Sequence, residues 1–438
     1  MDRTLRRRLT WITIVLLLAF FAFQVFHAYR QGVRVGFYRV AGGPTPAHHE
    51  PVPLDFSPRS EQRLRQDFAK DAPVRNVIFL IADGMSFAQL TAARYHYAGI
   101  NGRLVMERFP VAGWVSTHAI NSLYTDSAAS ASALATGFKT EPLMLSQTPA
   151  GEPQKTILEA AIERGLRAGM ITSSVIFDAT PAAFASHAAY RRDYAVVTAQ
   201  MATSGVEFLA SELLETTSDE RRALVAESLA NFEAAGFRRV TTREELAAAT
   251  GSQDKVLAWL EPGTITGREP EISLADLTDM ALQRLSNSDA GFFLLIEDEE
   301  VDTGSHTSDL PRVLRGIKSL DEAAARAVEF AQRNGNTLVL VTADHETGGL
   351  LLESDRHSNK ELPPTLPFRW SSTGHTTIPV PLLAYGPGAE RLGGVLDNTE
   401  VPRILSELMG LEMFSPRHEE STVGTSDTNP AESPRSAP

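Results

Sequence analysis

The chain has 438 residues, no cysteine and a formal net charge of −13 at pH 7. The lack of cysteine excludes disulfides, thiol nucleophiles and thiolate metal sites, and the acidic balance argues against nucleic acid as the main partner. With 43% hydrophobic and 22% charged residues, the composition is that of an ordinary globular protein. An acidic protein that handles an anion needs locally concentrated positive charge, from metal ions or a placed arginine.

Residues 1–39 carry a membrane signal. Arginines at positions 3, 6, 7 and 8 precede the run 9–29, which holds no Asp, Glu, Lys or Arg and could span about 30 Å as a helix. A cleavable signal usually has a shorter apolar region and a small-x-small site after it. We therefore predict an uncleaved anchor in a bacterial inner membrane, with the rest of the chain facing the periplasm. Secretion to the periplasm after cleavage is the alternative.

Residues 40–69 are rich in Pro and Gly and are predicted to form a linker. Residues 415–438 are rich in Ser, Thr and Pro and are predicted to be a disordered tail. The folded unit is therefore expected over 70–414.

Within 70–414, apolar strand-like runs alternate with helical patterns. The predicted strands are 76–82, 169–175, 291–296, 337–342 and 380–384, and the predicted helices are about 155–168, 274–287 and 311–333. Continuous apolar runs between helices are typical of a mainly parallel sheet that is covered on both faces. We expect an α/β fold, a three-layer α/β/α sandwich, with ligands beyond the carboxyl ends of the strands.

Acids and histidines follow four of these strands. In chain order they are Asp83, then Asp178, then Glu297 with Asp302 and His306, and finally Asp344 with His345. A single acid at such a place is usually a loop cap, but four strand ends that meet at one sheet edge are hard to explain in this way. Oxygen and imidazole ligands without thiolate suit zinc, magnesium or manganese.

The small-residue segment 125–137 is predicted to form a helix, with Asp126 at its N-cap and Gly137 at its end. Such a helix could serve only to pack closely against the sheet. It could also present Ser127 in its first turn, where free N–H groups and the helix dipole favour an anion. A serine hydroxyl needs a base or a metal to act as a nucleophile.

Taken together, and in this order along the chain, these segments resemble the alkaline phosphatase family over about 75–380. The matching segments are Asp83-Gly84-Met85, residues 125–130 (TDSAAS), 178–183 (DATPAA), Glu297 through Asp302 to His306, 342–345 (TADH) and Gly374-His375-Thr376. Departures are Ser86 in place of a usual glycine, missing disulfides and a short stretch between His345 and His375. The resemblance implies the family's α/β sandwich with a short crown-like insertion.

The resemblance also implies a serine nucleophile, Ser127, two zinc ions and one magnesium ion. The first zinc would be held by Asp302, His306 and His375. The second zinc would be held by Asp83, Asp344 and His345. Magnesium would be held by Asp83, Thr180 and Glu297. Asp126 and Asp178 would support these groups, and Arg191 falls where the family keeps its phosphate-clamping arginine, although Arg192 beside it leaves the choice open by one position.

The activity implied is hydrolysis of small phosphate monoesters through a phosphoserine intermediate. A phosphodiesterase or phosphonate hydrolase of the same superfamily is one alternative, and a non-catalytic exported protein that binds phosphate or metal is another. Sulfatase is disfavoured because no cysteine is available for its modified nucleophile. Monomer and homodimer both remain open.

Overall fold

The computed structural model describes residues 52–55, 57, 62–68, 72–213, 219–353 and 365–413. The expected anchor (1–39) and tail (415–438) lie outside the described residues. In the part of the chain that is described, no helix is long and apolar enough to cross a membrane.

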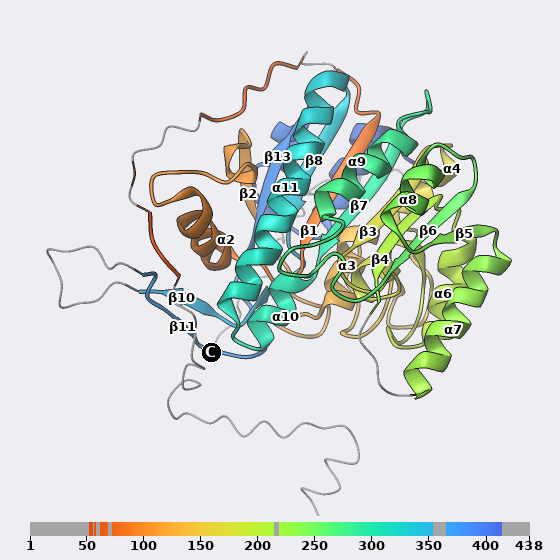
Figure 1. Cartoon of the computed structure of the whole chain (residues 1–438), viewed down its shortest axis with the longest axis horizontal. Coiled ribbons are helices and arrows are strands. Elements are labelled where there is room, and N and C mark those ends of the chain that lie inside the picture. The colour runs from red at the N-terminus through yellow and green to blue at the C-terminus, as the bar shows by residue number, and fades with distance from the viewer. Residues whose placement is uncertain are drawn as a thin grey trace, which may run out of the picture. The chain divides into compact units, whose positions relative to one another are not determined.

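A ten-stranded sheet forms the centre of the fold (Figure 1), in the order β14-β2-β13-β8-β1-β7-β3-β4-β6-β5. Its strands are β1 Asn76–Ala82, β2 Val111–Ser116, β3 Arg167–Thr172, β4 Phe208–Glu212, β5 Phe237–Val240, β6 Lys255–Leu260, β7 Phe292–Asp298, β8 Thr337–Thr342, β13 Val380–Tyr385 and β14 Gly394–Asp397. Only β13 runs antiparallel to its neighbours among these strands. Every residue of β1, β7 and β8 is buried, which is why these strands read as unbroken apolar runs.

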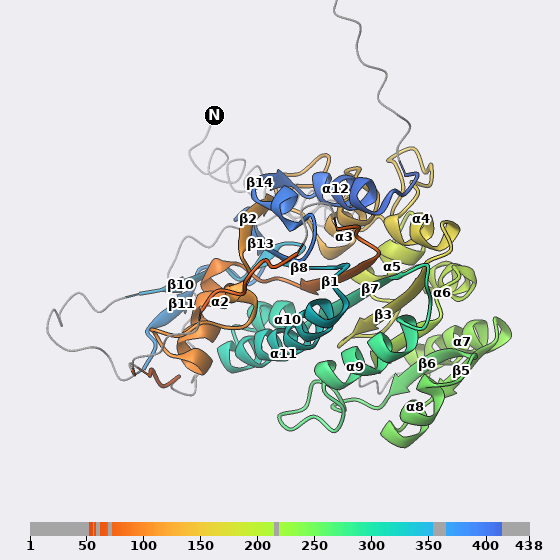
Figure 2. The same ribbon diagram turned by 90° about the horizontal axis from the view of Figure 1, so that it is seen from above.

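Helices cover both faces of the sheet, so the three-layer prediction is confirmed. Figure 2 shows α9 and α11 on one face and α3, α4, α5 and α12 on the other. The helices are α2 Phe87–Ala93, α3 Ser127–Thr136, α4 Ile157–Glu163, α5 Ala179–Ala185, α6 Tyr194–Thr203, α7 Asp219–Ala234, α8 Arg243–Thr250, α9 Leu274–Leu285, α10 Glu300–His306, α11 Leu310–Asn334 and α12 Glu400–Met409. Two small antiparallel ribbons complete the fold: β9 (Glu346–Thr347) with β12 (His375–Thr376), and β10 (Leu350–Leu352) with β11 (Phe368–Trp370).

All five predicted strands and all four predicted helices are present; β1 and β8 have the predicted ends, whereas the ends of the other elements are shifted. The strand predicted over 169–175 begins and ends earlier, as β3, because 173–175 turn away toward α5. Five strands of the central sheet were not predicted: β2, β4, β5, β6 and β14. Of these, β2, β5 and β14 have short, partly exposed sequences that lack a continuous apolar run.

The described parts of 40–69 correct the linker prediction. Val52 is only 4% exposed, and its carbonyl accepts a hydrogen bond of 2.8 Å from Leu366 N. The ring of Phe68 packs edge-on against Tyr385, with 5.2 Å between centroids. The described residues Val52 and Phe68 therefore pack against the folded unit, although the sequence around them resembles a linker.

Candidate active site

The metal-type residues converge at the carboxyl edge of the sheet because β8, β1, β7 and β3 are neighbours in this order. Asp83 directly follows β1, and Glu297 lies at the end of β7. Asp344 and His345 follow β8, and Thr180 lies in the first turn of α5, which comes after β3. Four segments that are distant in sequence thus bring their ligand atoms to one place, as predicted from the strand order rule for open α/β sheets.

The first group joins α10 to the β12 ribbon. Asp302 and His306 lie one helical turn apart, with 3.2 Å between Oδ2 and Nε2. His375 Nε2 lies 3.6 Å from Asp302 Oδ1 and 3.2 Å from His306 Nε2. The Nδ1 atoms of His306 and His375 lie 2.6 Å and 2.8 Å from the carbonyl oxygens of Thr373 and Thr125. Since a carbonyl only accepts, each Nδ1 carries the proton, so that a deprotonated Nε2 on each ring could offer its lone pair to one cation.

Protonation in this group follows its contacts. The hydrogen bond with Asp302 raises the pKa of His306 to about 9 when no metal is bound. Burial opposes ionisation of Asp302, but His306, His345 and His375 together lower its pKa below the ordinary value. The Asp302 carboxylate is therefore ionised and is surrounded by three imidazole rings.

The second group centres on His345, which is fully buried. Its Nε2 lies 3.3 Å from Ser127 Oγ, 3.2 Å from Asp344 Oδ2 and 3.5 Å from Asp83 Oδ1. Burial, followed by the nearby His375, lowers the pKa of His345 well below its ordinary value. A neutral imidazole with carboxylates around it is suited to bind a cation.

Several buried oxygen atoms at this edge have no hydrogen-bond partner. They are Asp83 Oδ1, Asp344 Oδ2 and Thr180 Oγ1. Burial raises the pKa of Asp83, raises that of Asp344 to about 7 and raises that of Glu297 to about 8, and the neighbouring acids add to each shift. Burying several like charges without a cation is very costly. The unpartnered oxygens and the lack of thiolate therefore fit bound divalent metals.

Around Glu297 only oxygen atoms are available. Its carboxylate accepts a hydrogen bond of 2.6 Å from Thr172 Oγ1. The hydroxyl of Thr180 is near enough to lower the pKa of Glu297 somewhat, although it makes no hydrogen bond of normal geometry. With Asp83, this all-oxygen set suits a hard cation such as magnesium.

Ser127 begins α3, as predicted, and its side chain is almost fully buried. Asp126 caps the helix, because its Oδ1 accepts a hydrogen bond of 3.1 Å from Ala129 N. Gly137 ends the helix in the left-handed conformation, with φ of 76°. The serine hydroxyl thus lies at the positive end of the helix, next to His345.

Arg191 is held beside Ser127 by two carboxylates. Its Nη2 lies 2.8 Å from Asp178 Oδ1, and its Nη1 lies 3.4 Å from Asp126 Oδ2. Burial works against its charge, but Asp178 and Asp126 more than offset this and raise its pKa. Arg192, by contrast, is exposed. The geometry thus favours Arg191 over Arg192 as the candidate clamp.

Asp178, which was expected to support the site, accepts hydrogen bonds from three groups. Besides Arg191, it accepts hydrogen bonds of 2.8 Å from Ala179 N and 2.9 Å from Ser174 Oγ. These contacts lower its pKa although it is buried. In this structure Asp178 therefore orients the arginine.

Two supporting threonines were missed by the sequence analysis. Thr347 donates its hydroxyl to Asp302 Oδ1 and lies 3.2 Å from His345 Nδ1. Thr172 donates to Glu297, as described above. Both are buried threonines at strand positions, where this residue type is common. The only available signal was their closeness in sequence to His345 and to the end of a predicted strand.

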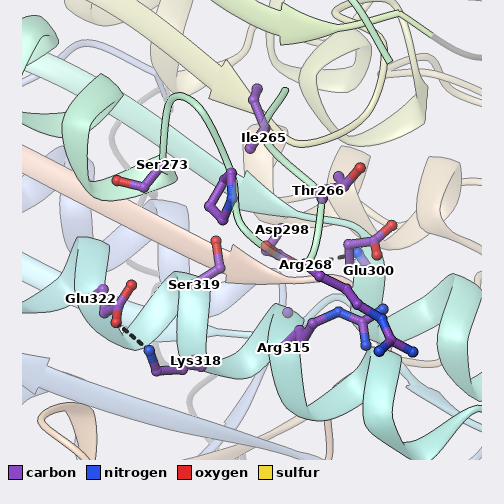
Figure 3. Close-up of a pocket in the computed structure, with 13 residues that line it drawn as sticks. Ile265, Thr266, Arg268, Ser273, Asp298, Glu300, Arg315, Lys318, Ser319 and Glu322 are labelled. Atoms are coloured by element: carbon purple, nitrogen blue, oxygen red, sulfur yellow. Dashed lines mark hydrogen bonds and ion pairs between the residues drawn. The ribbon is translucent and has the colours of Figure 1, made fainter. Parts of the chain in front are cut away.

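A separate cavity of about 100 Å³ lies behind α10 and α11 and is shown in Figure 3. It is lined by Arg268 from the loop that follows β6 and by Arg315 and Lys318 from α11, with Asp298 and Glu300 at its inner end. None of the proposed metal ligands lines it. We therefore place substrate at Ser127 and not in this cavity.

Gly84 allows the chain to turn between Asp83 and α2. Its φ is +80°, and a Cβ added there would lie 2.8 Å from the Cα of Asp302. We expect Gly84→Ala to cost about 2–4 kcal/mol of stability and to displace Asp302, measured as a lower Tm and weaker zinc binding. Gly165→Ala is the control, because its φ is +88° with open space around it. Equal losses in both variants would contradict close packing at Gly84.

Comparisons with known proteins agree with this geometry. The family model described as alkaline phosphatase matches residues 74–219 and 212–363. The chain belongs to the alkaline phosphatase family. It is therefore a phosphatase, and the family supports hydrolysis of phosphate monoesters.

Its relatives within the alkaline phosphatase family match over most of their lengths. An alkaline phosphatase of Escherichia fergusonii is 29% identical, covering 78% of this chain and 87% of the relative. A streptomycin-6-phosphate phosphatase of Streptomyces griseus is 31% identical, covering 78% and 91%. The structure of the alkaline phosphatase from the Antarctic bacterium TAB5 superposes with a TM-score of 0.69 at 28% identity, covering 78% of this chain and 99% of that one.

Proposed function

We propose that this phosphatase hydrolyses phosphate monoesters to an alcohol and inorganic phosphate through a phosphoserine at Ser127, at a centre of two zinc ions and one magnesium ion. The observation that carries the proposal is the Ser127 hydroxyl, buried at a helix start between Arg191 and a set of unpartnered carboxylate oxygens. A non-catalytic binding protein would have no need for a nucleophile in this position.

The residues divide into three ligand sets. The first zinc would be held by Asp302, His306 and His375. The second zinc would be held by Asp83, Asp344 and His345. Magnesium would be held by Asp83, Thr180 and Glu297. When bound, the zinc ions would lower the pKa of the serine hydroxyl and stabilise negative charge on the leaving oxygen.

The protein's own groups position the reaction. Ser127 Oγ attacks phosphorus, the bond to the alcohol oxygen breaks, and the phosphoryl group remains on the serine. Arg191 offers two N–H donors to the phosphoryl oxygens, and Asp126 and Asp178 hold its planar group in place. The free N–H groups at the start of α3 favour the same charge. Water then cleaves the bond between phosphorus and Ser127 Oγ and releases phosphate.

Magnesium in the third set is supported by its all-oxygen donors. A variant of the TAB5 enzyme in which a histidine is replaced by aspartate has been solved with magnesium in its M3 site. In this chain the position two residues before Thr180 is an aspartate, Asp178, and not a histidine. A nitrogen ligand that could favour zinc in the third site is therefore missing at this position. We therefore expect about two zinc ions and one magnesium ion per chain.

The test combines metal content with substrate class. We expect the purified protein to hydrolyse p-nitrophenyl phosphate at least about 100-fold faster than bis-p-nitrophenyl phosphate, because a diester leaves one fewer charged oxygen for Arg191 and the metals. Elemental analysis of the same preparation should find zinc and magnesium in a ratio of about two to one. Faster diester cleavage would instead favour the phosphodiesterase alternative, and zinc alone would contradict the magnesium assignment.

We also propose that residues 1–39 anchor the protein in the inner membrane, with the catalytic unit in the periplasm. The proposal is based on the uncharged run 9–29, which follows a cluster of arginines. Recovery of activity in the soluble periplasmic fraction, with a mature N-terminus beyond residue 30, would show that the segment is cleaved.

A further inference from the structure

Five exposed large apolar side chains belong to chain segments that adjoin the candidate site residues, and we call them the apolar rim. Their exposed fractions are 82% for Leu123, 57% for Tyr124, 45% for Leu143, 39% for Tyr190 and 43% for Ile378. Large apolar side chains that gather on a surface usually mark a binding site. The rim is therefore a candidate contact for something that approaches Ser127.

One side of the rim is tied to the phosphate clamp. Leu143 N donates to Asp126 Oδ1 at 3.0 Å, and Leu143 O accepts from Arg191 N at 2.7 Å. Leu145 and Ala188 pair as an antiparallel bridge, so the chain segments that carry Leu143 and the residue before Arg191 run side by side. That residue is Tyr190. Leu143 and Tyr190 therefore lie on the two chain segments that carry and adjoin Arg191.

The other side of the rim is tied to the first zinc set. Leu123 and Tyr124 directly precede Thr125, whose carbonyl accepts from His375 Nδ1 at 2.8 Å. Ile378 follows His375 by three residues, and its N donates to Thr376 Oγ1 at 3.3 Å. The rim thus flanks the catalytic centre both at the arginine and at the histidines.

Leu143 occupies its place at an energetic cost. Its φ is 72°, in the left-handed region that non-glycine residues seldom adopt. The two backbone hydrogen bonds to Asp126 and Arg191 hold this conformation. Glycine or asparagine would fit it with less strain. A strained leucine with an exposed side chain contributes neither to the core nor to the turn, which suggests a role for its apolar surface.

We propose that the apolar rim binds the leaving group, and that the preferred substrates are phosphate monoesters of apolar alcohols. The inference rests on the proposed function. Ser127 and Arg191 fix the phosphoryl group from within, so the alcohol half of the ester must project outward, past Leu143 and Tyr190 on one side and Tyr124 on the other. A second copy of the chain is the competing occupant, and the experiment below separates the two.

The test uses n-alkyl phosphates from ethyl to octyl with the metal-loaded protein. These esters have nearly the same leaving-group basicity, so chain length changes mainly the apolar contact. Each fully buried methylene raises the binding constant about fourfold, and each half-buried one raises it about twofold. We expect kcat/KM to rise about twofold per methylene and then to level off, with glycerol phosphate among the slowest substrates. Constant kcat/KM across the series would overturn the proposal.

Variants locate the effect. Leu143→Asn retains the left-handed conformation but loses the apolar surface, so the dependence of kcat/KM on chain length should weaken markedly, and further with Tyr190→Ser. Val395→Ser is the matched control, because Val395 is 67% exposed on β14 and should leave the dependence intact. An equal effect of all three variants would overturn the assignment to the rim.

Two further outcomes are distinguishable. If no alkyl phosphate is hydrolysed at any chain length, the proposed function itself fails. If hydrolysis is normal but independent of chain length, and Leu123→Ser converts a dimer into a monomer, the rim is a subunit contact and the leaving-group proposal is wrong.

Discussion

Replacing Ser127 by alanine should lower kcat for p-nitrophenyl phosphate by about 10³-fold or more, since the nucleophile of the covalent step is lost. The metals should remain bound, because the serine hydroxyl only borders the ligand sets, 3.3 Å from His345 Nε2. Rapid acid quench after mixing with a ³²P-labelled substrate should trap phosphoprotein in the wild type and none in the variant.

Ser132→Ala provides the comparison within the same helix. Ser132 is fully buried, and its hydroxyl accepts a hydrogen bond of 2.7 Å from Ser146 N. Its loss should cost about 1 kcal/mol of stability while kcat stays near the wild-type value. Near wild-type turnover in Ser127→Ala would show that another group attacks phosphorus.

Removing the metals with EDTA should make the folded protein lose stability steeply as the pH rises from about 6.5 to 8.5. In the metal-free fold, burial raises the pKa of Glu297 from 4.5 to about 8 and that of Asp344 from 3.8 to about 7. A raised pKa means that the fold holds protons which the unfolded chain has already released. That stabilisation is complete only below the ordinary pKa values of 4.5 and 3.8, and it is lost progressively until the pH passes the raised values, at roughly 1.4 kcal/mol per proton and pH unit.

The histidines do not reverse this direction. The pKa of His306 is raised from 6.5 to about 9 by Asp302, so its contribution also declines above pH 6.5. The lowered pKa of His345 acts in the opposite direction, but only below its ordinary value of 6.5. The buried Asp298, which also has a raised pKa, lies outside the proposed ligand sets. Its effect should be similar with and without metal.

Differential scanning calorimetry at pH 6.5, 7.5 and 8.5 tests this, with EDTA and with added zinc and magnesium. The difference in Tm between the two forms should widen with pH, because bound cations replace the protons. Parallel curves would mean that the carboxylates are not the groups neutralised by metal.

The fold was largely predictable because its central strands are buried on both faces. β1 and β8 match the predicted ranges to the residue, since each holds a continuous apolar run with polar residues at or next to its ends. The edge of the sheet was less predictable, because β14 is half exposed and its pairing with β2 depends on tertiary contacts. The buried role of Val52 likewise depends on a partner more than 300 residues away.

The candidate site was predictable where the residue type itself carries chemistry. Acids and histidines that follow strands indicated a cation site, and Asp126 as an N-cap residue indicated where α3 begins. Sequence could not show that Asp178 is bound to Arg191 or that Thr347 supports Asp302, because these are contacts between side chains of common types. Nor could it separate Arg191 from Arg192, which differ only in the direction that the loop gives them.

The central strand order also bears on how the chain matures. Ligand residues follow β1, β3, β7 and β8, which are contiguous in the sheet but spread across more than half of the sequence. A nascent chain that ends before Asp344 lacks part of the second zinc set, and a fragment without β12 lacks His375. With the proposed ligand sets, tight metal uptake would require nearly complete synthesis and strand pairing. The ions would act as a checkpoint that stabilises only chains whose long-range topology is already correct.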